Sequence, residues 1–248
     1  MANNGNNKRV RSEEDDGGQD AKGHRVEGTV EVGPDFDTNA TLARLQADTP
    51  REIVFKRTGV YTSRGFGNGD EAFEEEIGKL PGVKKLTVDG VCRCFGRDLD
   101  DLIPQSAEAA RLIGTATPLW TVGNFIEWLG ESDGNHPNLR ELVIGERGED
   151  VVGAEDVIRA MEKTGSAQKR KLTIRIENVE KDLEEDTMKI LTLLYATSKH
   201  SAITWEIVME TEMHKPEADR VPIAVPLQVP EGMEDFYEDA TDDFEARK

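Results

Sequence analysis

The chain repeats one five-residue pattern four times, and this repetition constrains its fold more than any other feature. Each copy has a basic residue, a second charged residue, an apolar residue, a spacer and another apolar residue. The copies occupy residues 51–55, 84–88, 140–144 and 170–174. Apolar residues at alternate positions predict a strand that buries one face, and the recurrence of the pattern predicts a protein built from copies of one unit.

The segments that follow these strands have the apolar spacing of amphipathic helices. Phe73, Ile77 and Leu80, for example, lie four and three residues apart and therefore share one side of a helix. The predicted helices span residues 70–80, 121–130, 154–161 and 182–198. A helix between two strands lets the second strand run in the same direction as the first, so the pattern predicts a parallel sheet.

Two architectures combine parallel strands with intervening helices. In a solenoid the units stack in chain order, whereas a doubly wound sheet has helices on both faces and a changed strand order. The strands of this chain alternate in polarity, as Leu172, Ile174 and Ile176 do with Thr173 and Arg175 between them. Central strands of a doubly wound sheet are apolar throughout. We therefore predict an α/β fold: a strand-helix repeat solenoid with a curved parallel sheet that has one charged face.

The spacing of the strands is regular except at one place. The first apolar residues of five predicted strands are 33, 56, 30 and 31 residues apart, and they are Ile53, Leu86, Leu142, Leu172 and Ile203. The interval of 56 is close to two units. It contains either a degenerate copy around Arg111 or an insertion at 96–120 with its own helix at 104–113.

The composition divides the chain into four parts. The repeat domain begins with a strand at 26–32 and a short helix that Asp37 or Thr38 caps. The predicted parts are a disordered polar tail (1–23), the repeat domain (24–215, with the insertion at 96–120), an extended Pro/Val arm (216–230) and an acidic-aromatic tail (231–248).

The two C-terminal parts each have two interpretations. Apolar residues occupy the odd positions 221–229, so the arm either packs on its own solenoid as a terminal cap or docks on a partner. The tail has eight acidic and two basic residues with aromatic residues among them. It is either a segment that folds onto a basic, apolar groove of a partner or a passive solubilising tail.

Charge and cysteine content limit the partners and the compartment. The net charge of −19 disfavours bare nucleic acid and anionic membranes and favours a protein with a basic surface. Cys92 and Cys94 are two residues apart, a spacing that rarely allows a disulfide, so a reducing compartment is expected. No apolar run reaches membrane-spanning length, and we expect a cytoplasmic or nuclear protein.

No motif nominates a catalytic, cofactor-binding or metal site. Gly65, Gly67 and Gly69 lie between a strand and a helix, but the loop lacks the Lys-Ser/Thr of a phosphate-binding loop. The pair Cys92 and Cys94 has no second pair of zinc ligands at a recognisable spacing. The chain is therefore predicted to be no enzyme and to hold no cofactor.

At Leu80-Pro-Gly-Val-Lys-Lys-Leu-Thr-Val88 and His136-Pro-Asn-Leu-Arg-Glu-Leu-Val-Ile144 the chain resembles a leucine-rich-repeat protein of the ribonuclease-inhibitor-like kind. That family has Leu-x-x-Leu-x-Leu at the strand and a helix after it, at close to this period. The Asn or Cys that usually follows the strand is replaced here by Asp89-Gly90 and Gly145-Glu146, so the resemblance is to a divergent member. It implies a concave sheet that binds proteins, usually without catalysis.

These observations predict a non-enzymatic adaptor or scaffold that binds another protein with the charged face of its sheet. One alternative is a structural component of a large assembly that uses its C-terminal arm. Another is an acidic chaperone for basic nuclear proteins, with the basic residues at 8–11 as an import signal. The segment 96–120 is a second predicted contact. The predicted partner-binding residues are Lys56, Thr87, Asp89, Val143, Thr173, Arg175, Glu206, Phe236, Tyr237 and Phe244.

Overall fold

Strands and helices alternate along the described residues of this α/β protein. The computed structural model describes residues 28–33, 36–56, 70–89, 99–114, 119–131, 135–147, 149–164, 171–181 and 184–229, together with 234, 235 and 238. The strands are β1 (Thr29–Val32), β2 (Glu52–Lys56), β3 (Lys85–Asp89), β4 (Ala109–Ile113), β5 (Glu141–Gly145), β6 (Leu172–Val179) and β7 (Ile203–Met209). The helices are α1 (Thr38–Asp48), α2 (Asp70–Gly78), α3 (Leu99–Leu102), α4 (Leu119–Glu131), α5 (Ala154–Thr164), α6 (Glu184–His200) and the short 3₁₀ helices η1 (Glu210–Glu212) and η2 (Glu217–Asp219).

Several predicted features lie outside the described residues. They are the N-terminal tail at 1–23 with its basic cluster at 8–11, the glycine loop at 65–69, Cys92, Cys94, Phe236, Tyr237 and Phe244.

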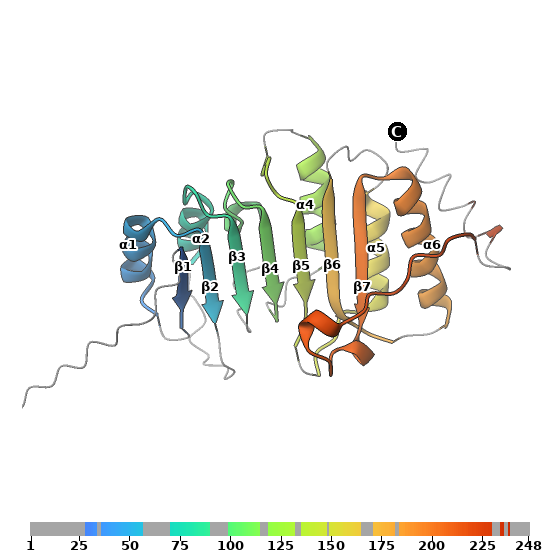
Figure 1. Cartoon of the computed structure of the whole chain (residues 1–248). Helices are drawn as coiled ribbons and strands as arrows, with labels where there is room; N and C mark the ends of the chain where they lie inside the picture. The colour runs from blue at the N-terminus through green and yellow to red at the C-terminus, as the bar shows by residue number, and fades with distance from the viewer. Residues whose placement is uncertain are drawn as a thin grey trace, which may run out of the picture.

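The strands form one open sheet in which every neighbouring pair is parallel (Figure 1). Their spatial order is the order of the chain, with β1 and β7 at the two edges. The sheet thus lacks the changed strand order of a doubly wound fold. Each strand pairs only with the strands that precede and follow it among the described strands.

Local sequence signals fix the ends of several helices. The Asp37 side chain accepts a hydrogen bond from the Ala40 backbone N–H at 2.7 Å, which is the predicted cap of α1. Thr49 ends that helix in the left-handed region at φ 42°. Acidic residues in the first turn of α5 and Lys163 in its last turn have the charges that the helix dipole favours. None of the described helices combines the length and the hydropathy that crossing a membrane requires.

The core lies between the helices and one face of the sheet. The register aligns one buried row across all seven strands: Val30, Ile53, Leu86, Ala110, Leu142, Ile174 and Trp205. These side chains belong to one cluster with buried apolar residues of the helices, among them Leu45 of α1, Ile77 of α2, Ile126 of α4 and Met161 of α5. The α-helices therefore cover the same face of the sheet (Figure 1).

The register corrects the predicted alignment at one step, from β5 to β6. The structure pairs Leu142 with Ile174, whereas the sequence alignment placed Leu172 opposite Leu142. The predicted alignment of Leu172 with Ile203 in the last two strands is confirmed. Leu172 and Ile174 point to the same face because strand side chains alternate with a period of two. The buried face was therefore assigned correctly, and the register was wrong by one such period.

The segment 96–120 is not an insertion. Residues 109–113 form β4, which pairs with β3 and β5 and continues the repeat. No helix spans 104–113, and within the described part of that segment the short α3 precedes the strand. The copy is difficult to recognise in the sequence because Ala110 occupies the core position where the other strands have a larger apolar residue.

Candidate functional site: the open face of the sheet

The face of the sheet opposite the helices, which we call the open face, carries three rows of side chains. The first row is Thr29, Glu52, Lys85, Ala109, Glu141, Thr173 and Thr204. The middle row is Glu31, Val54, Thr87, Arg111, Val143, Arg175 and Glu206, and the third is Lys56, Asp89, Ile113, Gly145, Glu177 and Val208. Charged and short polar side chains dominate these rows, so the face is suited to contact with polar groups.

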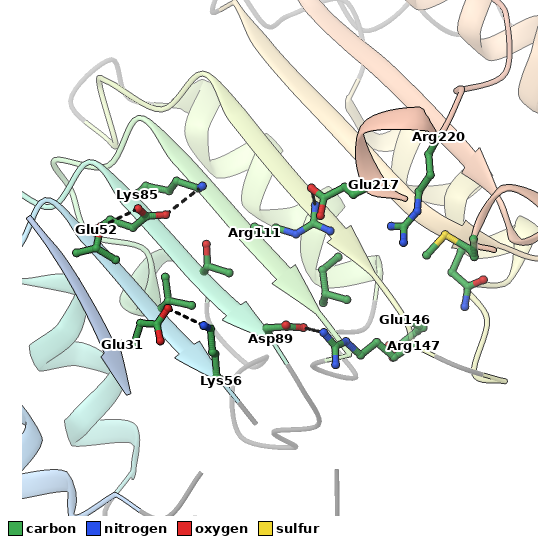
Figure 2. A pocket seen from close by; sticks show the side chains of 16 residues that line it. Glu31, Glu52, Lys56, Lys85, Asp89, Arg111, Glu146, Arg147, Glu217 and Arg220 are labelled. Carbon is green, nitrogen blue, oxygen red and sulfur yellow. Dashed lines mark hydrogen bonds and ion pairs between the residues drawn. The ribbon is translucent and has the colours of Figure 1, made fainter. Parts of the chain in front are cut away.

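Ion pairs span the open face: two join neighbouring strands, and a third joins β3 to the residues that follow β5 (Figure 2). The pairs are Lys56 with Glu31 (2.6 Å between Nζ and Oε1), Lys85 with Glu52 (3.0 Å between Nζ and Oε1) and Arg147 with Asp89. These side chains are about one-third to three-fifths exposed, apart from a more buried Glu52, so each pair contributes at most about 1 kcal/mol to stability. Such pairs order the face without making it rigid, and a ligand can exchange partners with them.

A groove of about 840 Å³ lies over β1 to β4 on this face (Figure 2). Its other wall comes from the C-terminal part of the chain, through Met213, Glu217 and Arg220. Five acidic residues (Glu31, Glu52, Asp89, Glu146 and Glu217) and five basic residues (Lys56, Lys85, Arg111, Arg147 and Arg220) line it. The groove is thus balanced in charge, although the whole chain has a net charge of −19.

Glu177 lies at one end of the groove, under a cluster of three arginines. Its side chain is fully buried, and Oε2 accepts hydrogen bonds from Arg111 Nη2 at 3.0 Å and from Arg220 Nη1 at 3.1 Å. Oε1 accepts from Arg175 Nε at 3.0 Å, and Arg175 also contacts Glu206, at 3.4 Å between Nη1 and Oε2. A carboxylate in such a site is stable only because charged donors replace the water it has lost.

Residues 210–220, which we call the strap, bring Arg220 to this cluster. They follow β7 directly and lie against the open face in front of the last strands (Figure 1). Glu217 Oε1 lies 3.1 Å from Arg111 Nη1, and Arg220 Nε donates to the Lys215 carbonyl at 3.2 Å. Hydrogen bonds from Lys215 and from the Val221 backbone N–H hold the pKa of Glu212 below its ordinary value. The strap is thus fixed mainly through charged side chains.

Two backbone features make room for the buried carboxylate. Gly145 is the neighbour of Glu177 on β5, and a Cβ at that position would lie 2.8 Å from the Glu177 carbonyl oxygen. Asn178 has φ 62°, lies at an irregularity in the pairing of β6 with β7, and donates from Nδ2 to the Asp150 carbonyl at 2.6 Å. A side chain at residue 145 would therefore displace β6 where it carries Glu177.

Glu146 is a half-buried carboxyl group at the same end of the groove. Loss of solvent around the group, and then the neighbouring charge of Asp150, raise the pKa of Glu146 above its ordinary value.

The predicted arm at 216–230 divides into two parts in the structure. Its first residues belong to the strap, whereas residues 221–229, which we call the distal arm, extend past β7. Ile223 is partly buried against the core, and its N–H bonds to the Ile207 carbonyl at 2.8 Å. Val221, Val225 and Leu227 are 63%, 38% and 95% exposed, and no other large apolar side chain in the described ranges is exposed.

The predicted partner-binding residues on the strands all lie on the open face, but they divide into two groups. Lys56, Thr87 and Asp89 line the groove. Val143 is buried, with 5% of its surface exposed, and Arg175 and Glu206 pair with each other beside Glu177. Thr173 lies half-buried in the first row.

Sequence reasoning missed most of the charged residues that shape the site. Arg111 lay in the segment with two interpretations, and Glu177 resembles an ordinary solvent-facing residue of a strand. If β4 had been recognised in the sequence, aligning it with β3 would have placed Arg111 next to Thr87, in the middle row of the open face. The contact of Arg220 with Glu177 spans 43 residues and has no local signal.

Comparison of the chain with protein-family models, curated proteins and solved structures finds no match.

Proposed function

We propose that the chain is a leucine-rich-repeat-like solenoid whose parallel strands follow one another in chain order. In this proposal it acts as a non-enzymatic adaptor or scaffold that binds a segment of another protein. The observation that carries the proposal is the groove on the open face, which the helices leave uncovered. In a repeat protein this is the surface that successive units extend, so it suits an elongated ligand.

The charges of the groove indicate the kind of segment that binds. Five acidic and five basic side chains line it, so a segment with both signs of charge can pair along it. The net charge of −19 acts at longer range and favours a partner with a basic surface during encounter. The small Thr29 and Thr87 among the lining residues leave space between the charged side chains for a peptide backbone.

Placing a long side chain in the groove is expected to weaken capture of the partner strongly. Thr87→Arg adds a guanidinium group to a half-buried position in the middle row. Proteins captured from the native source by the wild-type chain should decrease about tenfold or more, which corresponds to about 1.4 kcal/mol of binding free energy. The measurement is affinity purification with quantitative mass spectrometry, after thermal denaturation has shown equal stability.

The matched control adds the same charge on the opposite side of the molecule. Ser198→Arg changes an exposed residue of α6, a helix on the covered face of the sheet. It should capture the same proteins as the wild-type chain. Equal capture by the Thr87→Arg chain would rule out the groove as the binding surface.

The distal arm favours a second candidate function, a structural component of a larger assembly. Its three exposed apolar side chains are concentrated within seven residues, and clusters of this kind mark contact sites between proteins. Val221, Val225 and Leu227 are exposed and therefore accessible to a neighbouring molecule, whereas Ile223 between them packs against the core.

Light scattering over a concentration series tests this second candidate. If the arm joins copies of the chain, the mean mass of the wild type should rise with concentration. Leu227→Ser should shift that rise to concentrations about tenfold higher. The substitution removes a side chain whose full burial stabilises a contact by about 1.5–3 kcal/mol. Gln228→Ala, a change at the next exposed position, should leave the rise unaltered. A constant monomer mass for the wild type would exclude self-assembly through the arm.

A further inference from the structure

The strap makes contacts of the same kind that the groove offers to a ligand. Glu217 places a carboxylate on Arg111, and Arg220, three residues later, places a guanidinium group on Glu177. Both strap residues also line the groove. The strap therefore occupies one end of the open face as a bound segment would.

The attachment of the strap is of a kind that can open. Glu217 is 60% exposed, so water reaches its ion pair with Arg111 and screens it. Arg175 Nη2 is buried and has no hydrogen-bond partner within the described ranges, so the closed cluster leaves one donor unsatisfied. None of the residues of η1 or η2 is buried, so little apolar burial holds the strap.

The strap also covers charged groups that an external segment needs. Arg111, which pairs with Glu217, is only 19% exposed, and Glu177, which pairs with Arg220, is fully buried. Removing the strap would free Arg111 of its Glu217 contact and leave Glu177 without its Arg220 donor. The vacated positions then require an acidic group over Arg111 and a guanidinium group over Glu177.

We propose that the strap is an internal competitor for the open face, displaced by a protein segment that carries an acidic residue and an arginine three positions later. The inference rests on the proposed function and specifies the segment that the face recognises. In the closed state the groove extends over β1 to β4. In the open state the binding surface continues across β5 and β6 to Glu206 of β7. The affinity for the partner is reduced by the fraction of time that the strap is closed.

A strap with reversed charges tests the inference without changing the net charge of the chain. The full-length variant carries Glu217→Lys with Arg220→Glu, which sets like charges against Arg111 and Glu177. The probe is a synthetic peptide of residues 210–224, and its control is the same peptide with residues 217 and 220 exchanged. The two peptides have equal composition and charge.

We expect the peptide to bind the variant about tenfold more tightly than the wild-type chain, because in the wild type the attached strap competes at a high effective concentration. The exchanged peptide should bind the variant about tenfold more weakly than the natural one. Equal binding of the two peptides to the variant, or equal affinity of the natural peptide for both chains, would overturn the inference.

Hydrogen exchange on the wild-type chain keeps the test decisive if the variant folds poorly. Excess natural peptide should accelerate amide exchange within 210–220 about tenfold, whereas the exchanged peptide should not. Unchanged exchange with the natural peptide would refute displacement of the strap. The ion pairs by which Glu217 and Arg220 hold the strap are made to Arg111 and Glu177 and not to Thr87. Loss of partner capture by Thr87→Arg together with a negative peptide result would therefore reject the strap mechanism and leave the groove as the binding surface.

Discussion

Replacing Glu177 by glutamine is expected to lower the free energy of unfolding by about 3 kcal/mol or more. The side chain is fully buried and accepts hydrogen bonds from Arg111, Arg175 and Arg220. Glutamine keeps the shape but removes the negative charge, and its NH₂ group faces an arginine donor in place of an acceptor oxygen. At least one guanidinium group then remains buried without its partner. Urea denaturation followed by circular dichroism measures the loss.

The matched control removes an exposed carboxylate from the same face. Glu31 pairs with Lys56 at 2.6 Å, but both side chains are more than half exposed. Glu31→Gln should therefore cost less than about 1 kcal/mol. If the two substitutions changed stability equally, the Glu177 cluster would contribute no more than a surface ion pair, and its burial would carry no structural importance.

The sequence predicted the buried face of the sheet well because that face is covered and the other is open. Alternation in residues 52–56 identified Ile53 and Phe55 as core residues, and both are buried. The same holds after β2: Phe73 and Ile77 of α2 and Leu80 just after it are buried, as their spacing predicted. Such periodic signals depend only on which side of an element meets the core.

The candidate site was predictable only in part, because its contacts join distant parts of the chain. Lys56, Thr87 and Asp89 were found by their alternation with core residues. In β6 residues 176–179 are all buried, so the alternation of buried and half-buried residues ends at Glu177. Glu177 is on the open face and accepts a hydrogen bond from Arg220 of the strap, which covers it. A local pattern cannot report a covering segment that lies some forty residues away.

Replacing Gly78 by alanine is expected to destabilise the protein by about 2–3 kcal/mol, near the upper end for overpacked sites. A Cβ at this last residue of α2 would clash with the Asp101 backbone carbonyl oxygen of α3. The chain after α3 is fixed to the same place, since Gln105 N–H bonds to the Gly78 carbonyl at 3.2 Å. Backbone atoms cannot rotate away from a clash as side chains can. Thermal and urea denaturation measure the change.

Gly123→Ala in α4 is the matched control, because it adds the same methyl group to another closely packed helix. Its Cβ would meet Lys163 Cδ at 2.9 Å, and that flexible side chain can move aside. Alanine also favours the helix over glycine by about 1 kcal/mol, so this variant should be as stable as the wild type or more so. A Gly78→Ala chain with wild-type stability would show that α2 and α3 can separate without cost. In that case β3, which lies between these two helices in the chain and carries Thr87 and Asp89, would not be held rigidly enough to define the groove.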